Sequence, residues 1–418
     1  MNDKAKTIRD PIHGDIKLEG VFLDLIDAPE IQRLSNIKQL GFAHLVFPGA
    51  HHTRLEHSLG AYQLASEAST VLDLADDEKK LVSCAALLHD IGHGPFSHTL
   101  ESILRDSLNV DHLDLTEELV LGKHAIFDTD EKELIESSTV FDVLNKYGIN
   151  HKEINEIIRG KDNSKQYLGQ ILNSSIDVDQ LDYLIRDAYY TGVAYGMIDI
   201  ERFLQTLVIH NGRLAVKKKG VGVVENILMA RTLMYSSVYF HKTVRIAELM
   251  LSKAIELYKD ADPFEIFKHT DDELITSLKK MGDFQKEIAI RLKYRNLFKQ
   301  AFTLTKVDLA KEDIEKLAKF DNIHERRKKE EEFEEILGIP KGHIIIDMPY
   351  TELHQSEPRI DLTDVGILDA TVIKKLDEFT PVGNAVKSRS IPDWTVMIVT
   401  DEKHRDIVAS KSKEILFK

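Results

Sequence analysis

Apolar residues in the first two thirds of the chain recur mainly at spacings of three and four, the periodicity of amphipathic helices. One such pattern follows Asp76 and Asp77, two residues that can cap a helix, and its apolar positions are Leu81, Val82, Ala85, Ala86 and Leu88. Gly92, Gly94 and Pro95 then interrupt the pattern. The sequence therefore predicts a helix that ends near residue 89, followed by a turn.

Two later patterns differ from the first. Residues 207–210 and 213–216 are short apolar runs on either side of Asn211-Gly212, a dipeptide typical of a two-residue hairpin turn. A helical pattern then continues from about Val223 to Tyr258. We therefore expect a hairpin followed by one long helix.

The chain changes character beyond Gly338 and Pro340. Residues 343–348 and 394–399 predict strands, whereas residues 368–376 and the C-terminus resemble helices. The predicted fold class is mainly α, with a helical domain over residues 1–258, a helical extension over 259–337 and a smaller mixed α/β region over 338–418.

Composition narrows the class of protein. The 418 residues are too many for one compact core, and 43% hydrophobic with 30% charged residues is ordinary for a globular protein. The formal net charge of -15 argues against nonspecific binding to nucleic acid or anionic membranes, although a local basic pocket can still take an anionic substrate. The charged run Glu325–Glu332 fits a solvated helix with salt bridges between its turns.

The chain carries features of an intracellular protein. Cys84 is the only cysteine, so no intrachain disulfide can form. The first residues, Met1–Lys6, lack the apolar core of a signal peptide, and no apolar run is long enough to span a bilayer. We therefore expect a cytoplasmic protein, with neither a membrane nor nucleic acid as its partner.

The string Leu87–His98 contains three histidines and an aspartate, together with glycines that permit close approach of the backbone. His89 and Asp90 are helical neighbours about 100° apart, so both side chains can reach a metal beside the helix end. His57 and Asp179 are the candidates for a third and fourth ligand. Imidazole and carboxylate suit Fe, Mn, Zn or Ni, and such an ion can polarise a phosphoryl oxygen or activate water. The set predicts a metal-dependent hydrolase.

A polar stripe follows the predicted helix near residue 180. Asp179, Tyr183 and Asp187 are spaced at i, i+4 and i+8, which places them on one helical face. The opposite side is apolar, with Val178, Leu181, Leu184 and Ile185. The stripe is therefore either a polar surface or the lining of a cavity.

A second stripe lies in the long predicted helix. Arg231, Tyr235, Tyr239 and Lys242 step by four, four and three residues along one face. Two cations and two aromatic rings suit a ligand with phosphates and a flat base. The alternative is a helix–helix interface with snorkelling cations, and the stripe alone favours it.

Three further histidines are candidates for phosphate contacts or proton transfer: His93, His98 and His112. Their imidazoles titrate near neutral pH and can protonate a leaving oxygen. The sequence does not decide which nitrogen of each ring carries the proton.

Together these motifs resemble the HD-domain deoxynucleoside triphosphate triphosphohydrolases, in the branch that includes the human sterile-alpha-motif and HD-domain enzyme. The resemblance covers residues 9 to about 245, and its matching stretches are Asp10–Gly14, Gln32–Leu34, Ile37–Gly41, Val46–Ala50, Arg54–Gly60, Leu88–His98 and Ile176–Asp187. It implies that residues 1–258 form a helical HD domain. It also implies hydrolysis of a dNTP to deoxynucleoside and triphosphate.

The resemblance assigns roles by position. The implied metal ligands are His57, His89, Asp90 and Asp179. His98 matches the residue that protonates the leaving 5′ oxygen or attacks phosphate, Glu101 matches its carboxylate partner, and His112 joins the catalytic group. Contacts to triphosphate and sugar are implied for Arg54, His93, His112, Tyr183 and Arg231. Sugar recognition is implied for Gln39, Leu40, Asp187 and Tyr239, and we add Lys242 from the second stripe.

Four positions depart from the family pattern. Leu113 replaces the glutamate that usually follows the histidine at 112, and Gln180 replaces a phosphate-binding lysine. Phe240 stands at a position that is polar in the family, which leaves the base preference open. Asp27 and Gln32 match residues of a guanine-nucleotide activating site, but Ser35 replaces its arginine. Activation by a guanine nucleotide is therefore not expected from these residues.

Three hypotheses remain open. The leading one is a dNTP triphosphohydrolase with one divalent transition metal, with Mg²⁺ on the substrate phosphates as a further candidate, assembled as a homo-oligomeric dimer or tetramer. The second is an HD phosphodiesterase or nucleotidase that acts on other nucleotides. The third is a nucleotide-sensing or nucleotide-binding protein with little catalysis, for which Leu113 leaves room.

Overall fold

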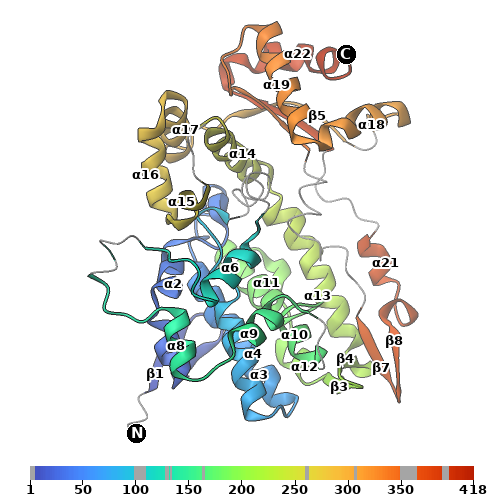
Figure 1. Ribbon diagram of the computed structural model, residues 1–418. Helices are drawn as coiled ribbons and strands as arrows, with labels where there is room; N and C mark the ends of the chain where they lie inside the picture. Colours follow the sequence, from blue (N-terminus) through green and yellow to red (C-terminus); the bar gives the residue numbers. More distant parts are fainter. Residues whose placement is uncertain are drawn as a thin grey trace.

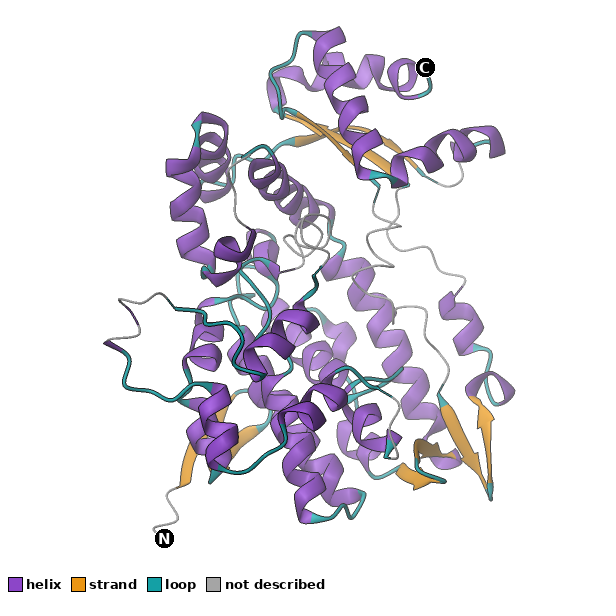
Figure 2. Cartoon of the chain, viewed as in Figure 1, coloured by secondary structure: helices purple, strands orange, loops and turns teal. Residues whose placement is uncertain are grey.

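The computed structural model describes residues 5–97, 110–127, 131, 134–161, 165–258, 263–305, 308–348, 365–387 and 395–418. Figures 1 and 2 show that helices dominate and that the strands lie in small sheets near the ends of the molecule. The predicted mainly α fold, with a smaller mixed α/β C-terminal region, is therefore confirmed. Among the described residues, no helix combines the length and apolar character needed to cross a membrane.

The chain begins with a hairpin that the sequence patterns did not predict. Strand β1 (Ala5–Asp10) pairs antiparallel with β2 (Gly14–Glu19). Asp10 closes the turn, because its Oδ1 accepts hydrogen bonds from the backbone N–H groups of Ile12 and His13. Gly14 adopts a left-handed conformation with a φ of 77° at the end of this turn. The hairpin places His13 and Asp10 against the helical core.

The larger hydrophobic core lies within a body of packed helices (Figure 1). These helices are α1 (Val21–Ile26), α2 (Pro29–Gln32), α3 (Arg54–Val71), α4 (Asp76–Leu88), α6 (His112–Val120), α8 (Val140–Lys146), α9 (His151–Ile158), α10 (Gln166–Leu172), α11 (Val178–Thr191), α12 (Ile200–Leu204) and α13 (Val221–Met234). Short 3₁₀ turns, η1 (Arg33–Asn36) and η2 (Gly41–Leu45), connect α2 to α3.

Capping residues set the start of the helices that matter for the site. At α3, the backbone N–H of Thr53 donates to the Oε2 atom of Glu56 at 2.6 Å. At α11, the Oδ1 atom of Asp177 accepts from the backbone N–H of Gln180 at 2.9 Å. Helix α11 ends at Gly192, which takes the left-handed conformation common after a helix. Helix α4 begins at Asp76, with Ala75 as its N-terminal cap, so Asp76 and Asp77 lie in its first turn and are not its caps as expected. His89 is its C-terminal cap.

The predicted Asn211-Gly212 hairpin is confirmed. Strands β3 (Leu207–His210) and β4 (Arg213–Lys217) pair antiparallel, and both turn residues have positive φ, at 51° and 75°. The sheet then gains two strands from far along the chain, in the order β3-β4-β7-β8.

The expected helix over residues 368–376 is wrong, because this segment forms the hairpin β7 (Gly366–Asp369) and β8 (Val372–Lys375). Ala370 turns the chain with a φ of 58°, and the β-branched Val372 and Ile373 follow it. Strand β7 pairs in parallel with β4, so a long-range partner decides the conformation.

The expected continuous helix from Val223 to Tyr258 is also wrong. Helix α13 gives way to a π-helical turn at Tyr235–Tyr239, and α14 (Lys242–Glu256) begins after a break at Phe240 and His241. The side chain of His241 caps the new helix by accepting from the backbone N–H of Thr243 at 3.2 Å. The break ends the single helical face that was expected to run from Arg231 to Lys242.

Helices α14 to α17 lie between the large helical body and the C-terminal sheet (Figure 1). Their bounds after α14 are α15 (Pro263–Lys268), α16 (Asp271–Met281) and α17 (Asp283–Lys293). A second hydrophobic core joins these helices to the η2 segment and to one face of the C-terminal sheet.

The C-terminal sheet has the antiparallel order β5-β9-β6, with β5 (Lys299–Leu304), β9 (Val396–Thr400) and β6 (Ile344–Asp347). The strands expected near residues 343–348 and 394–399 are thus confirmed within the described part of the chain. The first strand starts at Lys299, well before the expected boundary at residue 338. The accompanying helices are α18 (Lys311–Ala318), α19 (Ile323–Leu337) and α22 (Arg405–Leu416), while α21 (Val382–Lys387) contacts α13.

The charged run in α19 is not a fully solvated face, which corrects the expectation. Three of its charged side chains are buried: Arg326, Lys329 and Glu330. Glu330 accepts from the Nζ atom of Lys253 in α14 at 2.6 Å and from the backbone N–H of Ile346 in β6 at 2.8 Å. The charges are buried because distant parts of the chain supply their partners.

Candidate metal centre

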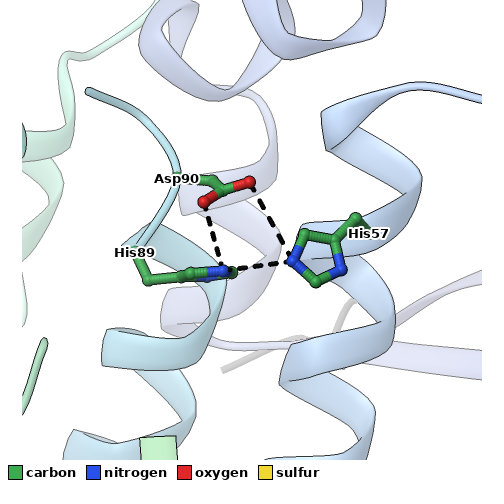
Figure 3. A group of neighbouring side chains, drawn as sticks. All are labelled: His57, His89 and Asp90. Atoms are coloured by element: carbon green, nitrogen blue, oxygen red, sulfur yellow. Dashed lines mark hydrogen bonds and ion pairs between the residues drawn. The ribbon is translucent and has the colours of Figure 1, made fainter. Parts of the chain in front are cut away.

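Three of the predicted metal ligands lie together at the junction of α3 and α4 (Figure 3). His57 projects from the first turns of α3, and His89 and Asp90 stand at the end of α4. The two Nε2 atoms of His57 and His89 are 3.2 Å apart, and the Oδ1 atom of Asp90 is 3.3 Å from that of His89. All three residues are buried. Among the described residues, this is the one group of three or more His, Cys, Asp or Glu side chains with the spacing of metal ligands.

Asp179 reaches the same group from α11. Its Oδ1 atom lies 3.2 Å from the Nε2 atom of His57 and 3.8 Å from that of His89. Helix α11 packs against α3, and this contact brings the residue near a group that is more than 80 positions away in sequence. All four candidate ligands therefore converge from three helices.

The hydrogen bonds of the second ring nitrogens orient the two imidazoles. The Nδ1 atom of His57 lies 2.8 Å from the Oδ2 atom of Asp182, and the Nδ1 atom of His89 lies 2.8 Å from the carbonyl oxygen of Ala86. Each Nδ1 therefore donates, which turns both Nε2 atoms toward each other as ligand atoms. Two imidazole lone pairs and the carboxylate of Asp90, with the carboxylate of Asp179 beside the imidazoles, fit a divalent metal with mixed nitrogen and oxygen ligands.

Electrostatics of the group lead to the same conclusion. Burial by itself lowers the pKa of His57, but the hydrogen bonds to Asp179 and Asp182 outweigh burial and raise it to about 10. Burial raises the pKa of Asp90, but the neighbouring His89, Arg54 and His93 outweigh it and hold that pKa well below the usual range. The group thus attracts positive charge, as a proton or as a cation that replaces it.

A buried ionic network supports His57 from behind, and its central residue, Asp182, was missed in the sequence. Asp182 lies 2.6 Å from the Nε2 atom of His13 and accepts two hydrogen bonds of 2.9 Å from Arg186. Arg186 donates in turn to Asp10 at 2.7 Å. A signal was available, because Asp182 and Arg186 are an i, i+4 pair on the stripe-bearing helix.

Gly60 makes room for this network. A Cβ atom built on Gly60 would lie 1.8 Å from the Oδ1 atom of Asp182 and 2.4 Å from the Nη2 atom of Arg186. Both neighbours are fully buried and fixed by several bonds. Only glycine at this position allows α3 to approach α11 so closely.

Arg54 and His93 lie beside the metal group. The Nη1 atom of Arg54 donates to the Oδ2 atom of Asp90 at 2.5 Å, and its Nε atom donates to the Oγ atom of Ser97 at 3.0 Å. His93 has its Nε2 atom 3.4 Å from the Oδ1 atom of Asp90. Burial, followed by the positive charge of Arg54 and by His112, lowers the pKa of His93 well below its usual value, so its ring is neutral.

His112 stacks on His93, with ring centroids 4.1 Å apart and an interplanar angle of 13°. The two rings place His112, at the start of α6, near the predicted phosphate side of the site. The remaining catalytic candidates, His98 and Glu101, lie outside the described residues.

The polar stripe of α11 continues from the metal group to Asp187. Tyr183 lies between His57 and Tyr239, at ring-centroid distances of 6.4 Å and 6.0 Å. The hydroxyl of Tyr239 donates to the Oδ2 atom of Asp187 at 2.7 Å. The polar stripe of α11 is therefore not a plain polar surface, because Asp187 is buried and Tyr183 and Tyr239 are partly buried.

His52 is a second residue that the sequence reasoning missed. Its Nε2 atom lies 2.7 Å from the Oδ1 atom of Asp187, and its ring stacks on Tyr190 at 4.5 Å. The backbone carbonyl of His52 accepts from the N–H of Gln39 at 3.0 Å. Gln39 is buried, and its Oε1 atom has no hydrogen-bond partner among the described residues. Leu40 follows and is half-buried.

The two cations of the second stripe, Arg231 and Lys242, lie on different helices and bind different partners. Arg231 is buried, and its Nη1 atom donates to the carbonyl oxygen of Ser175 at 3.1 Å and to the Oε1 atom of Gln180 at 3.3 Å. Lys242 lies on the next helix, and its Nζ atom donates to the Oε1 atom of Gln300 in β5 at 2.7 Å. The break after Tyr239 thus separates Lys242 from the rest of the stripe.

Comparison with known proteins identifies the class. A model of the HD domain matches residues 54–187, which contain all four candidate ligands, and a model of the HD associated region matches residues 198–417. The chain therefore belongs to the HD-domain phosphohydrolase family and also carries the region associated with it.

Several curated proteins are similar to this chain. A protein of Methanocaldococcus jannaschii is 34% identical over 98% of this chain and 82% of its own length. YwfO of Bacillus subtilis is 38% identical over 64% of this chain and 59% of its own length. The deoxynucleoside triphosphate triphosphohydrolase SAMHD1 of Homo sapiens is 29% identical over 76% of this chain and 58% of its own length. The chain thus spans less than two thirds of the Bacillus and human proteins.

Two solved structures share the fold over almost the entire chain. A hypothetical protein from Aquifex aeolicus is 29% identical, with a TM-score of 0.71, and the match covers 98% of this chain and all of that one. A phosphohydrolase from Bacteroides thetaiotaomicron is 27% identical, with a TM-score of 0.70, and the match covers 95% of this chain and all of that one. The likeness therefore includes the C-terminal sheet as well as the HD core.

Proposed function

We propose that this protein is a metal-dependent triphosphohydrolase that cleaves dNTPs to deoxynucleoside and triphosphate. One observation carries the proposal: a single face of α11 presents Asp179 at the metal group, Tyr183 beside it and Asp187 farther along. Eight residues of helix span about 12 Å. This length suits a ligand with phosphates at one end and a sugar at the other.

The roles of the residues follow from their surroundings. When bound, a divalent metal polarises a phosphoryl oxygen and lowers the pKa of a coordinated water. His57, His89, Asp90 and Asp179 would hold it. Arg54 sits beside this group as a permanent cation that can stabilise negative charge on the phosphates. The resemblance supplies His98, with Glu101, as the proton donor to the 5′ oxygen.

Sugar recognition is proposed for the opposite end of the stripe. Asp187 is held by two partners, His52 and Tyr239, so that its carboxylate has a fixed position. The Oε1 atom of Gln39, which has no hydrogen-bond partner among the described residues, offers a buried acceptor for a donor on the ligand. The ring of Tyr239 would pack against C2′ of the sugar and exclude a ribose hydroxyl.

Replacing Tyr239 with phenylalanine should reduce kcat/KM for dNTPs by roughly tenfold, because Asp187 loses a hydrogen bond to a charged group. The ring remains, so the ratio of dNTP to NTP turnover should change less than turnover itself. Steady-state kinetics with matched dNTP and NTP pairs measures both quantities. Tyr189→Phe is the control, because Tyr189 lies on α11, the helix that carries Asp187, and is 61% exposed.

Product analysis tests the reaction itself. Metal-loaded protein is incubated with each dNTP and each NTP, and the products are separated by anion-exchange chromatography. The proposal expects intact triphosphate and deoxynucleoside from dNTPs. Release of phosphate or pyrophosphate in its place would rule the proposed reaction out.

A second candidate is hydrolysis of other nucleotides, such as monophosphates or cyclic nucleotides. Its support is Gln180, a neutral residue at a position where the family has a phosphate-binding lysine. In addition, the Nη1 atom of Arg231 already donates to Gln180 and to the carbonyl oxygen of Ser175. The product analysis separates the two candidates. Tight dNTP binding with no metal-dependent product would favour the third hypothesis, a nucleotide-binding protein.

The cofactor and assembly of the proposed enzyme follow from the same resemblance. The metal is proposed to be Fe, Mn, Zn or Ni, with Mg²⁺ on the substrate phosphates, and elemental analysis of the purified protein identifies the resident ion. A homo-oligomer of two or four chains in the cytoplasm completes the proposal. Sedimentation velocity measures the assembly.

A further inference from the structure

The loop that follows Asp90 has a backbone that its surroundings must hold in place. Phe96, at the end of this loop, has a φ of 46°, a left-handed conformation that costs free energy for a residue with a Cβ atom. Arg54 holds the loop on the metal side through Ser97 and Asp90. The loop therefore needs a second set of contacts on its other side.

Arg33 provides one of these contacts. Its Nη2 atom donates to the carbonyl oxygens of Ile91 at 3.2 Å and His93 at 2.7 Å, both in the loop. Its Nη1 atom donates to the carbonyl oxygens of Phe267 at 3.1 Å and His269 at 3.4 Å. The guanidinium also lies 4.9 Å from the centre of the Phe267 ring. One buried cation thus joins the loop to the segment that ends α15.

Asp271 provides the other contact, from the first turn of α16. Its Oδ1 atom accepts from the backbone N–H of Phe96 at 3.0 Å, and its Oδ2 atom accepts from the backbone N–H of Lys38 at 2.9 Å. The ammonium of Lys38 lies 3.6 Å from the same carboxylate. Asp271 is almost fully buried, so these donors take the place of water.

The segment from Phe267 to Asp271 belongs to the HD associated region, whereas the loop and Arg33 belong to the N-terminal part of the chain. A Cβ atom on Gly94 would lie 3.3 Å from the ring of Phe267, which shows how closely the segment covers the loop. Bidentate contacts of this kind fix a backbone more strongly than apolar packing does.

We infer that Arg33 and Asp271 are positioning residues through which the HD associated region holds the loop after Asp90, and with it Asp90 and His93, in the geometry of the metal site. Neither residue touches a candidate ligand side chain in the described structure; both act on backbone groups of the loop. Only the expected change in turnover rests on the proposed function; the expected changes in loop exchange and metal affinity do not.

The first test is amide hydrogen exchange in the metal-free protein with Asp271→Asn. An asparagine accepts from one N–H group and turns its own amide toward the other, so the loop should open more readily. We expect exchange in the peptide covering residues 91–97 to accelerate at least about tenfold. Asp272→Asn is the matched control, because Asp272 is the next residue in the same helical turn and is exposed.

A second variant, Arg33→Lys, keeps the charge but cannot span four carbonyl oxygens from two segments. We expect the affinity for Zn²⁺, measured by chelator competition, to fall by roughly 10- to 100-fold in both variants, with a lower kcat and a nearly unchanged KM. If loop exchange and metal affinity match those of Asp272→Asn, the inference is wrong. Exchange and metal affinity remain valid readouts even if the wild-type protein fails to release triphosphate, which separates this inference from the proposed reaction.

Discussion

Asp179→Asn is expected to lose metal and turnover together. Asp179 is the candidate ligand that α11 contributes, with its Oδ1 atom 3.2 Å from the Nε2 atom of His57. An amide in its place provides a neutral oxygen, so the group loses one negative charge toward the cation. Loss of a residue that only hydrogen-bonds to a metal ligand costs about 10- to 100-fold in metal affinity, so loss of a ligand itself should cost more than about 100-fold. Elemental analysis and the dNTP product assay on one preparation measure both effects.

The matched control for this variant is Asp73→Asn. Asp73 is exposed and has a φ of 53°, a conformation that asparagine also adopts readily. The Asp73→Asn variant should therefore keep full metal content and activity. If Asp179→Asn retains stoichiometric metal with wild-type affinity, Asp179 is not a ligand, and the metal group is limited to His57, His89 and Asp90.

Asp182→Asn should have the largest effect on stability. Asp182 is fully buried and forms an ion pair with Arg186. Its carboxylate also lies within hydrogen-bond distance of His13 and His57. Removing one partner of a buried ion pair costs roughly 3–5 kcal/mol of unfolding free energy, since Arg186 stays buried and keeps only Asp10 as a carboxylate partner among the described residues. Urea denaturation of the metal-free protein measures this loss.

The pH dependence of that loss has a definite sign. Burial alone raises the pKa of Asp182, but Arg186, His13 and His57 outweigh it and hold the pKa well below its usual value. A carboxylate with a lowered folded-state pKa stabilises the fold above its unfolded pKa of about 3.9 and loses this contribution as the pH falls through the folded value. The difference between wild type and Asp182→Asn should thus be nearly constant between about pH 5 and pH 6 and shrink in acid. At higher pH it should also shrink, because Asp182 helps to raise the pKa of His57 to about 10. A difference that grows below pH 4 would contradict this account.

The helical spacing of the sequence identified the stripe on α11 correctly, because local periodicity alone places Asp179, Tyr183 and Asp187 on one face. Convergence of this stripe with His57 and His89 is a matter of tertiary structure. Spacing within one segment cannot predict it, and the family resemblance supplied that part of the prediction. The residues that orient the site, Asp182 and His52, were missed because the partners that reveal their roles, His57 and Asp187, lie far away in the sequence.

Two of the three corrected expectations have the same physical cause, a contact between distant segments. Residues 368–376 form strands because β4, some 150 positions earlier, offers them a free edge. The π-helical turn at Tyr235–Tyr239 ends a helix where apolar periodicity continues. The charges of α19 are buried because Lys253 and the β6 backbone satisfy them. For residues 368–376 and for the charges of α19, contacts between distant segments therefore outweigh the local pattern.

The pairing of β7 with β4 has a consequence for how the two sheets could have been inherited. After β6 enters the C-terminal sheet, the chain returns to lay β7 and β8 beside β4 and then comes back as β9 between β5 and β6. The two units are interleaved along the polypeptide. No single crossover point in the gene would separate the two sheets and leave both intact, so recombination should pass them on as a pair.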